Sequence, residues 1–335
     1  MILILSARED PHAKLVVCEL EDRAARYLWF DPVEFPAHAL ITVSLDAGGH
    51  PKYILEYEGK NIDLGEVRAI WHRRPGFPEA DDTITSDRVR DWISTESQIM
   101  LEGIWTTLNC LHVPGVERDR FAAENKLTQL VLASRLGFRI PRTFVTNRPN
   151  CLLESFKDFN GAAITKVLAN PAVWRSDENE PDDEEWSAFT HPVQRRDLGY
   201  YRAIRYAPVI IQEYIPKSLE LRITVVGSQV FAAAIHSQQS QRTRHDWRHY
   251  DLDHTPHEAH SLPDNISALC IQLVRSLHLT FGAIDMILTP DGEYVFLEIN
   301  PNGQWQWIQE LTGSPISNAI ADLLIAGLPG TEPGE

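Results

Sequence analysis

Two carboxylates and an amide near the end of the chain have the residue types and the spacing of a metal site. The stretch FGAIDMILTPDGEYVFLEINPNGQ contains two apolar runs around a Pro-Asp-Gly turn, which predicts a β-hairpin. With a two-residue Asp-Gly loop (291–292), Asp285 lies directly opposite Glu298, and Asn300 projects from the same face. Two facing carboxylates repel each other unless a cation lies between them. Oxygen ligands of this kind suit Mg²⁺, which usually shares its site with phosphate oxygens.

The alternative for this hairpin is a solvent-facing pair of acidic strands. Such strands alternate polar and apolar residues, whereas Phe296, Leu297 and Ile299 make the second strand largely apolar. The pattern therefore favours the metal site.

Lysines and an arginine elsewhere in the chain could supply the positive charge that a bound phosphate needs. Lys166 lies in the apolar run Ala-Ile-Thr-Lys-Val, and an inward lysine on such a strand needs an anion to stay charged. Lys126 lies on a predicted helix, where an ordinary surface lysine is the simpler interpretation. Glu220 could hold ribose hydroxyls, and Arg222 could grip phosphate with two N–H groups, although a structural Glu–Arg ion pair would use the same residue types.

The composition is that of a globular protein with two or three domains. Of the 335 residues, 43% are hydrophobic and 23% charged, and no apolar run is long enough to span a bilayer. The start MILILSARED predicts a first strand and no signal peptide. A net charge of −16 argues against nucleic acid and anionic membrane as partners. The four cysteines show no C-x-x-C spacing and are expected to be buried thiols of a cytoplasmic protein without a zinc site.

Apolar periodicity predicts the elements that position these residues. A strand at 2–5, a helix at 11–26 and a strand at 27–30 form a β-α-β opening, whose turn lacks the Gly-x-Gly-x-x-Gly of dinucleotide-binding proteins. Two further helices are expected, one over 87–108 and one over 118–136. The apolar face of the first includes Val89, Trp92 and Ile99. Later strands at 143–146, 162–167, 209–215, 219–226 and 229–235 precede a helix over 265–279, the hairpin, and a last helix with Ser314 as its N-cap.

Taken in order, these motifs resemble the ATP-grasp ligases. The residues that carry the resemblance are Lys126, Lys166, the run QEYIPKSLELRITVVG, Asp285 in GAIDMIL, and Glu298-x-Asn300 in LEINPNGQ. The chain resembles in particular the microviridin-type (graspetide) ribosomal-peptide ligases, and these cues extend over nearly its full length. They are Trp71-His72-Arg73-Arg74-Pro75, Pro141-Arg142-Thr143, His236-Ser237-Gln238, Asp246-Trp247-Arg248 and Asn300-Pro301-Asn302-Gly303-Gln304-Trp305.

The resemblance implies an α/β fold with α+β elements, ATP, and two Mg²⁺ ions. A pre-ATP-grasp domain would cover 1–112 and an ATP-grasp domain 113–330, with a small lid subdomain at about 141–208. One departure from the family pattern is the stretch 170–190, which has no glycine and contains an acidic segment at 176–185 that is expected to be a mobile loop. The resemblance assigns ATP to Lys126, Lys166, Glu213, Tyr214, Ile215, Glu220 and Leu297, and the metal ions to Asp285, Glu298 and Asn300.

For catalysis and substrate binding, the resemblance implies cationic side chains around a peptide. Arg222 would stabilise the transferred phosphoryl group, and Arg73, Arg74, Arg244 and Arg248 would steer acidic side chains, with plain surface arginines as the alternative. Asp246, Trp247 and Asn302 complete this set, and a tryptophan in so polar a loop is expected to pack on a leader peptide or on the acceptor site.

The reaction that the resemblance implies is ATP-dependent activation of a carboxylate as an acyl phosphate, followed by attack of a hydroxyl or an amine. The partner would be a ribosomal precursor peptide with a leader and an acidic core, and a homodimer is common in the resembled family. Two alternatives stay open: a RimK-like ligase that adds a free amino acid to a peptide or small molecule, and a nucleotide-binding protein without ligase activity.

Overall fold

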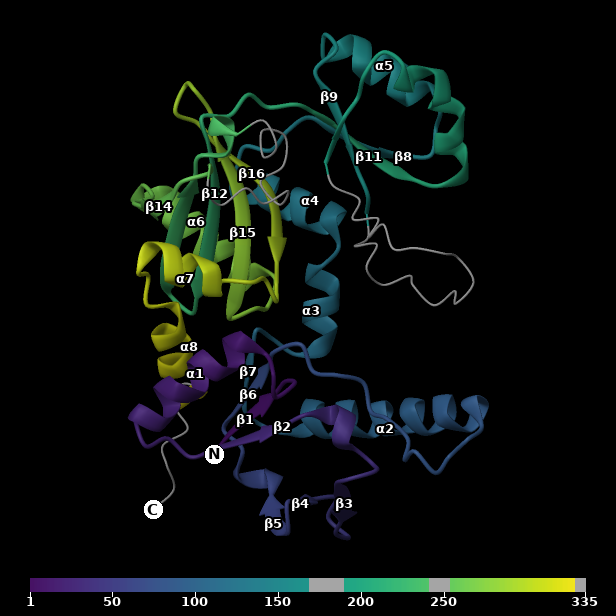
Figure 1. Cartoon of the computed structure of the whole chain (residues 1–335), viewed down its shortest axis with the longest axis vertical. Helices are drawn as coiled ribbons and strands as arrows, with labels where there is room; N and C mark the ends of the chain where they lie inside the picture. Colours follow the sequence, from purple (N-terminus) through teal and green to yellow (C-terminus); the bar gives the residue numbers. More distant parts are fainter. Residues whose placement is uncertain (169–189, 241–253, 329–335) are drawn as a thin grey trace.

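The computed structural model describes residues 1–168, 190–240 and 254–328, and the described residues form four β-sheets (Figure 1). The first sheet is parallel, with the order β2-β1-β6-β7. Its strands are β1 (Ile2–Leu5), β2 (Tyr27–Phe30), β6 (Ala69–His72) and β7 (Leu111–Val113). The helix α1 (Pro11–Asp22) connects β1 to β2, so the predicted β-α-β opening is confirmed.

Both faces of this parallel sheet are buried, which explains the uninterrupted apolar run of β1. Ile2 and Ile4 pack into a core cluster with α1 and with the last helix, α8 (Ile316–Ala326), whereas Leu3 and Leu5 pack on the opposite face. That opposite face is covered by the antiparallel sheet β3 (Leu40–Leu45), β4 (Pro51–Tyr57) and β5 (Lys60–Asp63) and by α2 (Asp87–Thr107). Short 3-10 turns lie at Pro32–Glu34, Leu64–Glu66 and Ser237–Gln239.

The helix α2 is present as predicted, and its predicted apolar face is confirmed at Ile104 and Leu108 but wrong at Val89, Trp92 and Ile99. Its buried residues include Leu101 and Trp105, whereas Trp92 and Ile99 are 62% and 61% exposed. The reason is tertiary: only the C-terminal half of α2 packs on the first sheet, and its N-terminal half extends beyond the body of the protein (Figure 1).

The single helix predicted over 118–136 is two helices, α3 (Glu117–Ala123) and α4 (Lys126–Leu136). The chain breaks between them because the side chain of Asn125 accepts a hydrogen bond from the amide of Thr128 and so caps a new helix. Lys126 is therefore the first residue of α4. Gly137 ends α4 with a φ of 101°.

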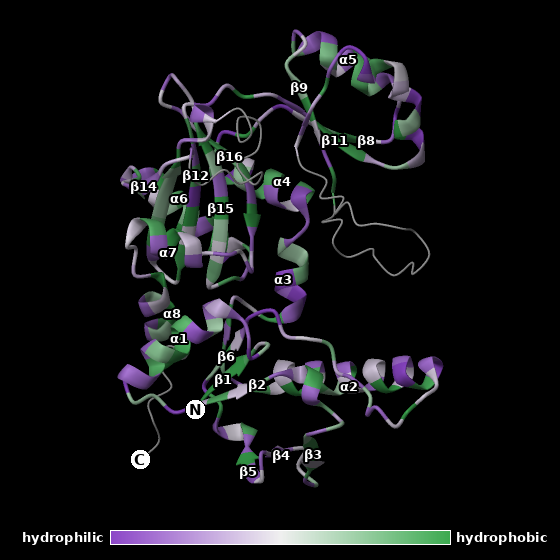
Figure 2. Cartoon of the chain, viewed as in Figure 1, coloured by the Kyte–Doolittle hydropathy of each residue, from purple (hydrophilic) through white to green (hydrophobic). Residues whose placement is uncertain are grey.

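The second half of the chain is built on a five-stranded antiparallel sheet with the order β14-β13-β12-β15-β16. Its strands are β12 (Leu219–Val226), β13 (Gln229–Ile235), β14 (His257–His260), β15 (Phe281–Leu288) and β16 (Tyr294–Asn300). One face packs on α4 and α6 (Asp264–Ser276), and the other on α7 (Gln306–Thr312) and α8. Accordingly, β15 and β16 are mostly drawn in the hydrophobic colours of Figure 2.

The helix α8 joins the two halves, because it packs on α1 as well as beneath the five-stranded sheet. The prediction of Ser314 as its N-cap is wrong, since α8 begins at Ile316. The Ser314 hydroxyl lies 2.7 Å from that of Thr312, and Gln309 of α7 accepts the amide of Ser317 instead. Gly327 follows the last residue of α8.

A small antiparallel sheet, β10-β9-β11-β8, lies beside the top of the five-stranded sheet in Figure 1. It consists of β8 (Thr143–Thr146), β9 (Ala163–Lys166), β10 (His191–Pro192) and β11 (Val209–Glu213). Its outer face packs on α5 (Asn150–Asp158) and on the 3-10 helix η4 (Asp197–Tyr206). The acidic segment 176–185 lies outside the described residues. The predicted limits of the domains and of the lid remain predictions.

All four cysteines are free thiols, but only three are buried as expected, because Cys18 is exposed. Burial raises the pKa of the Cys110 and Cys270 thiols to about 12. In the three ranges that the structure covers, no helix is both long enough and apolar enough to cross a membrane.

Candidate functional site

The hairpin β15–β16 has the predicted pairing at its centre and a different loop at its tip. Asp285 lies opposite Glu298, as the sequence predicts. The loop, however, has three residues (290–292), because the amide of Thr289 donates a hydrogen bond to the carbonyl of Glu293. The prediction of a two-residue loop is therefore wrong. A bulge at Leu297 compensates for the longer loop and restores the predicted register. The two carboxylates therefore meet across the strands in spite of the different turn.

Arg222 lies on the other side of Asp285. It is the cross-strand partner of Asp285 on β12, and its Nη1 donates to both carboxylate oxygens at 3.0 and 2.9 Å. Both residues are buried. The Glu–Arg ion pair considered from the sequence does not involve Glu220, which pairs with the buried Nζ of Lys217 at 2.7 Å.

Lys126 is part of this constellation and is not a plain surface lysine. Its Nζ lies 3.5 Å from a carboxylate oxygen of Glu298 and donates to the carbonyl of Val167 at 3.2 Å. Because Lys126 begins α4 and Val167 follows β9, these two contacts connect the five-stranded sheet to the small sheet.

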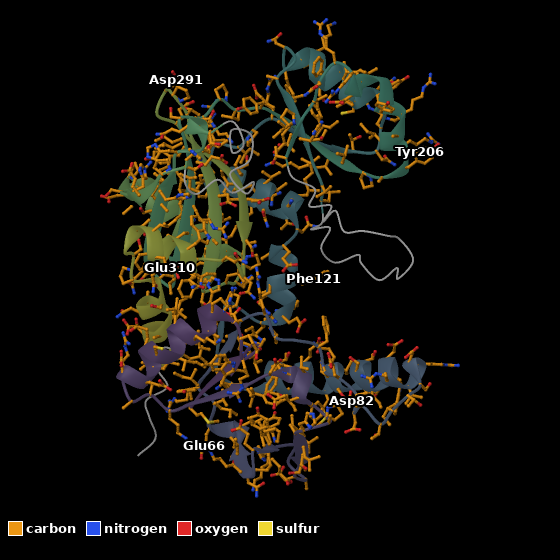
Figure 3. All side chains as sticks on the ribbon, viewed as in Figure 1. Glu66, Asp82, Phe121, Tyr206, Asp291 and Glu310 are labelled. Atoms are coloured by element: carbon orange, nitrogen blue, oxygen red, sulfur yellow. The ribbon has the colours of Figure 1, made fainter. Side chains whose placement is uncertain are left out.

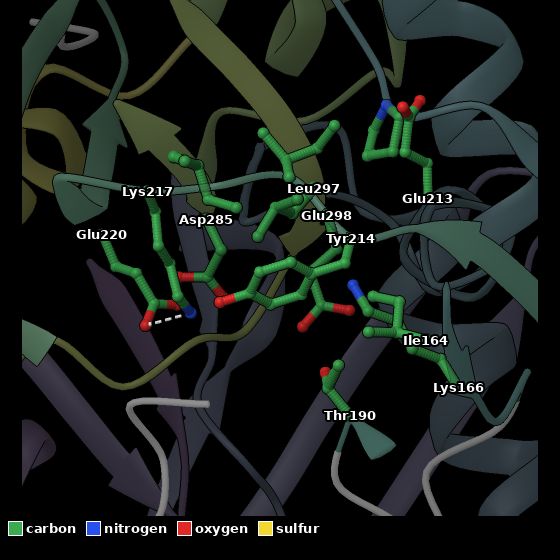
Figure 4. Close-up of a pocket in the computed structure, with 13 residues that line it drawn as sticks. Ile164, Lys166, Thr190, Glu213, Tyr214, Lys217, Glu220, Asp285, Leu297 and Glu298 are labelled. Carbon is green, nitrogen blue, oxygen red and sulfur yellow. Dashed lines mark hydrogen bonds and ion pairs between the residues drawn. The ribbon is translucent and has the colours of Figure 1, made fainter. Parts of the chain in front are cut away.

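A pocket opens between the small sheet and the edge of the five-stranded sheet formed by β15 and β16 (Figure 4). Eight of the residues predicted for ATP and metal line it together: Lys166, Glu213, Tyr214, Ile215, Glu220, Asp285, Leu297 and Glu298. In Figure 4 the ring of Tyr214 crosses the middle of the pocket, with its hydroxyl directed toward Asp285 and Lys217.

Sequence reasoning missed five lining residues: Pro141, Ile164, Thr190, Lys217 and Ile287. Ile164 and Ile287 could have been found, because each lies two residues along a strand from a predicted site residue and so faces the same side. No pattern in the sequence indicated Lys217, which is fixed by its ion pair.

The pocket has an apolar side and a charged side. Ile215 and Ile287 are buried in one small apolar cluster, against which Leu297 packs, and Ile164 lies nearby on β9. The charged side chains are Lys166, Lys217, Glu220, Asp285 and Glu298. A flat apolar group would match the apolar side. The carboxylates of the lining, which include Glu213, outnumber the two lysines, so a polyanion would match the charged side only together with a divalent cation.

The carboxylate of Glu213 is held at the rim by Arg142. The two side chains form two hydrogen bonds, of 2.8 and 3.1 Å, and Arg142 lowers the pKa of Glu213 below its usual range. The amide of Glu213 donates to the carbonyl of Arg142, and that of Tyr214 to the carbonyl of Ala162. The side chain and the backbone amide of Glu213 are therefore both held by contacts within the protein.

Six of the predicted site residues that the structure describes lie outside the pocket lining: Arg73, Arg74, Lys126, Arg222, Asn300 and Asn302. Asn300 is exposed, and its side-chain oxygen accepts the amide of Asn302 at 2.9 Å. Arg73 is 2% exposed and donates to the carbonyl and the side-chain oxygen of Asn302, whereas its neighbour Arg74 is exposed. Arg73 and Asn302 thus contact each other at the junction of the two halves. Arg244, Asp246, Trp247 and Arg248 lie outside the described residues, and their roles remain predictions.

The donors present fit a magnesium ion that is shared with phosphate. In the part of the chain that the structure describes, no three His, Cys, Asp or Glu side chains form a metal-binding group. Asp285, Glu298 and the nearby Asn300 are all oxygen donors, which Mg²⁺ prefers. Few protein ligands are typical of Mg²⁺ sites in which phosphate completes the coordination.

Two family models match the chain. The MvdD pre-ATP grasp domain matches residues 1–120, and the RimK-like ATP-grasp domain matches residues 201–324. A comparison with curated proteins gives no match.

Several solved structures are similar to this chain over nearly its whole length. The macrocyclase MdnC from Microcystis aeruginosa MRC, bound with the precursor peptide MdnA, is 32% identical, with a TM-score of 0.79 over 97% of this chain and 98% of that one. The macrocyclase MdnB from the same organism is 32% identical, with a TM-score of 0.74 over 96% and 98%. A RiPP-associated ATP-grasp ligase from Chryseobacterium gregarium, in complex with ADP and a leader and core peptide, is 28% identical, with a TM-score of 0.85 over 96% of both chains. The chain therefore belongs to the family of RiPP ATP-grasp ligases and macrocyclases.

Proposed function

We propose that this chain is an ATP-dependent ligase that activates Asp or Glu side chains of a ribosomal precursor peptide and joins them to hydroxyl or amino groups of the same peptide. The observation that carries the proposal is the pocket, whose lining combines apolar residues, two lysines and the paired carboxylates Asp285 and Glu298. The family of this chain supports a peptide substrate, because the structure of MdnC contains a precursor peptide and that of the C. gregarium ligase contains ADP and a leader and core peptide.

We assign the adenine of ATP to the apolar side of the pocket, next to Ile164, Ile215 and Leu297, which line it. The amides of Glu213 and Tyr214 bond within the protein, so the carbonyl of Glu213 and the amide of Ile215 are the groups we assign to the adenine edge. Glu220, held in place by Lys217, binds the ribose hydroxyls.

The phosphates then extend toward Lys166 and Lys126, with Arg222 behind Asp285. We assign two Mg²⁺ ions to Asp285, Glu298 and Asn300, where they would neutralise charge on the phosphates. The protein positions the reactants and stabilises charge, and no covalent intermediate with the enzyme is required.

In the first step, an oxygen of a substrate carboxylate attacks the γ-phosphorus of ATP, and the bond to the β–γ bridging oxygen breaks. This step yields an acyl phosphate and ADP, with Arg222 next to the charge that develops. In the second step, a Ser or Thr hydroxyl or a Lys amine of the peptide attacks the acyl carbon, loses its proton, and phosphate leaves. The peptide loses the elements of one water for each ester or amide formed.

The peptide would lie near Arg74 and near Arg244, Asp246, Trp247 and Arg248. Arg74 is exposed and so can reach an acidic side chain, and the other four lie outside the described residues. We place the reaction in the cytoplasm, because ATP is available there and the four free thiols are stable in a reducing compartment.

Mass spectrometry of a small acidic peptide encoded beside the gene, incubated with the enzyme, ATP and Mg²⁺, tests the proposed reaction. We expect the peptide to lose the mass of one water per linkage, and ADP to form in equal amount. Addition of the mass of an amino-acid residue would instead identify a RimK-like ligase. If several candidate peptides remain unchanged and no ADP forms, the result would indicate a nucleotide-binding protein without ligase activity.

The exposed apolar face of α2 supports a homodimer, which we also propose. Trp92 and Ile99 are seven residues apart, so they lie on the same face of the helix, and both are exposed. Packing of α2 on its copy would bury these apolar residues.

Trp92→Glu should therefore convert the dimer to a monomer, because it places a charge in the centre of this face. Light scattering after size-exclusion chromatography measures the mass. Tyr206→Glu is the matched control, since Tyr206 is also an exposed aromatic residue but lies on η4, beside the small sheet (Figure 3), and its change should leave the dimer intact. A dimer that survives Trp92→Glu would refute this interface.

A further inference from the structure

The end of β16 and the loop after it, residues 300–305, connect the proposed metal site to the N-terminal half; we call this segment the β16–α7 loop. It begins at Asn300 and ends at Trp305, which is buried in the core shared with α1 and α8 and packs edge-on against the ring of His12. Between these two ends it contacts Arg73.

We propose that Arg73 is a positioning residue that fixes the β16–α7 loop and thereby orients Asn300 and Arg222 at the phosphate end of the ATP site. The inference rests on the nucleotide site of the proposed function. It means that the N-terminal half, through Arg73, helps to form that site. It replaces, for Arg73, the contact with the peptide that the sequence predicts.

Three hydrogen bonds hold the middle of the loop to the end of β6. Arg73 Nη1 donates to the carbonyl of Asn302 at 3.1 Å and to its side-chain oxygen at 3.2 Å. The side-chain nitrogen of Asn302 donates to the carbonyl of His72 at 3.2 Å. Both atoms of the Asn302 amide group are thus bound to the N-terminal half, which leaves this side chain little freedom to bind a substrate.

The fixed loop contacts the site at two points. The amide of Asn302 donates to the side-chain oxygen of Asn300, which sets the orientation of that side chain. Farther along the loop, the backbone carbonyl of Gln304 accepts a hydrogen bond from Arg222 Nη2 at 3.3 Å, and the same guanidinium binds Asp285. A shift of the loop would therefore move a proposed metal ligand and the proposed phosphate-binding arginine together.

The surroundings of Arg73 favour a guanidinium there. Its Nε lies 3.4 Å from the carboxylate of Asp10, which also caps α1 through the amide of Ala13. Burial beside Arg73 lowers the pKa of His12 to about 4, so this ring is neutral and adds no competing charge. Because a planar fork makes these several bonds at once, a lysine at this position would keep the charge and lose the geometry.

The test measures binding of ADP to the full chain by calorimetry, with Mg²⁺ and with EDTA in its place. Arg73→Lys should leave the affinity for ADP in EDTA within about twofold of the wild type, because adenine and ribose bind far from the loop. It should reduce the gain in affinity that Mg²⁺ provides by about tenfold, the effect typical of residues that orient metal ligands. Asn302→Ala should show the same pattern, and the double variant should be no worse than the stronger single one.

The matched control is Arg26→Lys, since Arg26 forms an exposed ion pair with Glu66 and should change neither affinity. An unchanged Mg²⁺ gain in folded Arg73→Lys and in Asn302→Ala would overturn the proposal. Equal losses with and without Mg²⁺ would also overturn it, since they indicate a general structural role. If Arg73→Lys does not fold, Asn302→Ala alone decides. Failure of the proposed function is distinguishable, because the wild type would then show no Mg²⁺-dependent gain in ADP affinity.

Discussion

Glu298→Gln should reduce ADP formation by at least about a hundredfold while leaving the fold intact. Mutating residues that only orient metal ligands costs about 10- to 100-fold, so loss of a charged ligand should cost at least the upper value. Glu298 contacts other proposed site residues on two sides: it faces Asp285 across the hairpin, and its Oε2 lies 3.5 Å from Lys126 Nζ. Gln has nearly the same shape, so the change removes the charge and little else.

Stability should change little, because partly exposed ion pairs such as Lys126–Glu298 contribute about 0–1 kcal/mol. Thermal unfolding therefore separates folding from binding. The melting temperature of the free variant should match that of the wild type, and the additional rise that Mg²⁺ gives in the presence of ADP should be seen only in the wild type.

Glu310→Gln is the matched control, because Glu310 is an exposed glutamate on α7 of the same half (Figure 3) and its change removes the same charge. This variant should retain wild-type turnover. Turnover by Glu298→Gln within tenfold of the wild type would show that Glu298 is not a metal ligand.

The pairing of Asp285 with Glu298 could be predicted because alternation along a strand fixes which side chains share a face. The loop length could not. A bulge adds one residue to one strand, and the bulge at Leu297 happens to offset the extra loop residue. The correct pair was thus obtained from a turn that the chain does not form, and the sequence contains no signal for the bulge.

The helices show where local patterns are insufficient. The break before Lys126 has a local signal, since Asn125 is of a residue type that is preferred at helix N-caps. The exposure of Trp92 has none, because the covered part of α2 depends on how far the neighbouring sheet extends. For the same reason, the pair Arg73-Arg74 does not indicate which of the two is buried.

Gly303→Ala is the second change with a large expected effect. A Cβ at this position would lie 2.4 Å from the Cβ of Ala283 and 2.5 Å from Arg222 Nη2. Ala283 is fully buried in the middle of the sheet and cannot move, so either the loop or the guanidinium must shift. Both shifts disturb the bond from Arg222 to Asp285. A misplacement of about 1 Å can cost about 100-fold in rate, so we expect a loss of that size in ADP formation.

The matched control for Gly303→Ala is Gly199→Ala, because a Cβ at Gly199 meets no atom within 4 Å and its φ is not in the left-handed region. This variant should retain full turnover. The overpacked variant should lose about 1–3 kcal/mol of stability and still fold at room temperature.

Adding Ala283→Gly to Gly303→Ala distinguishes the two collisions, since it removes the contact with Ala283 and leaves the contact with Arg222. If displacement of Arg222 is the cause, the double variant should regain stability and remain slow. Recovery of turnover would show that the backbone of the loop, and not Arg222, had moved. Turnover by Gly303→Ala within threefold of the wild type would instead mean that the close approach of the β16–α7 loop to Arg222 has no part in the reaction.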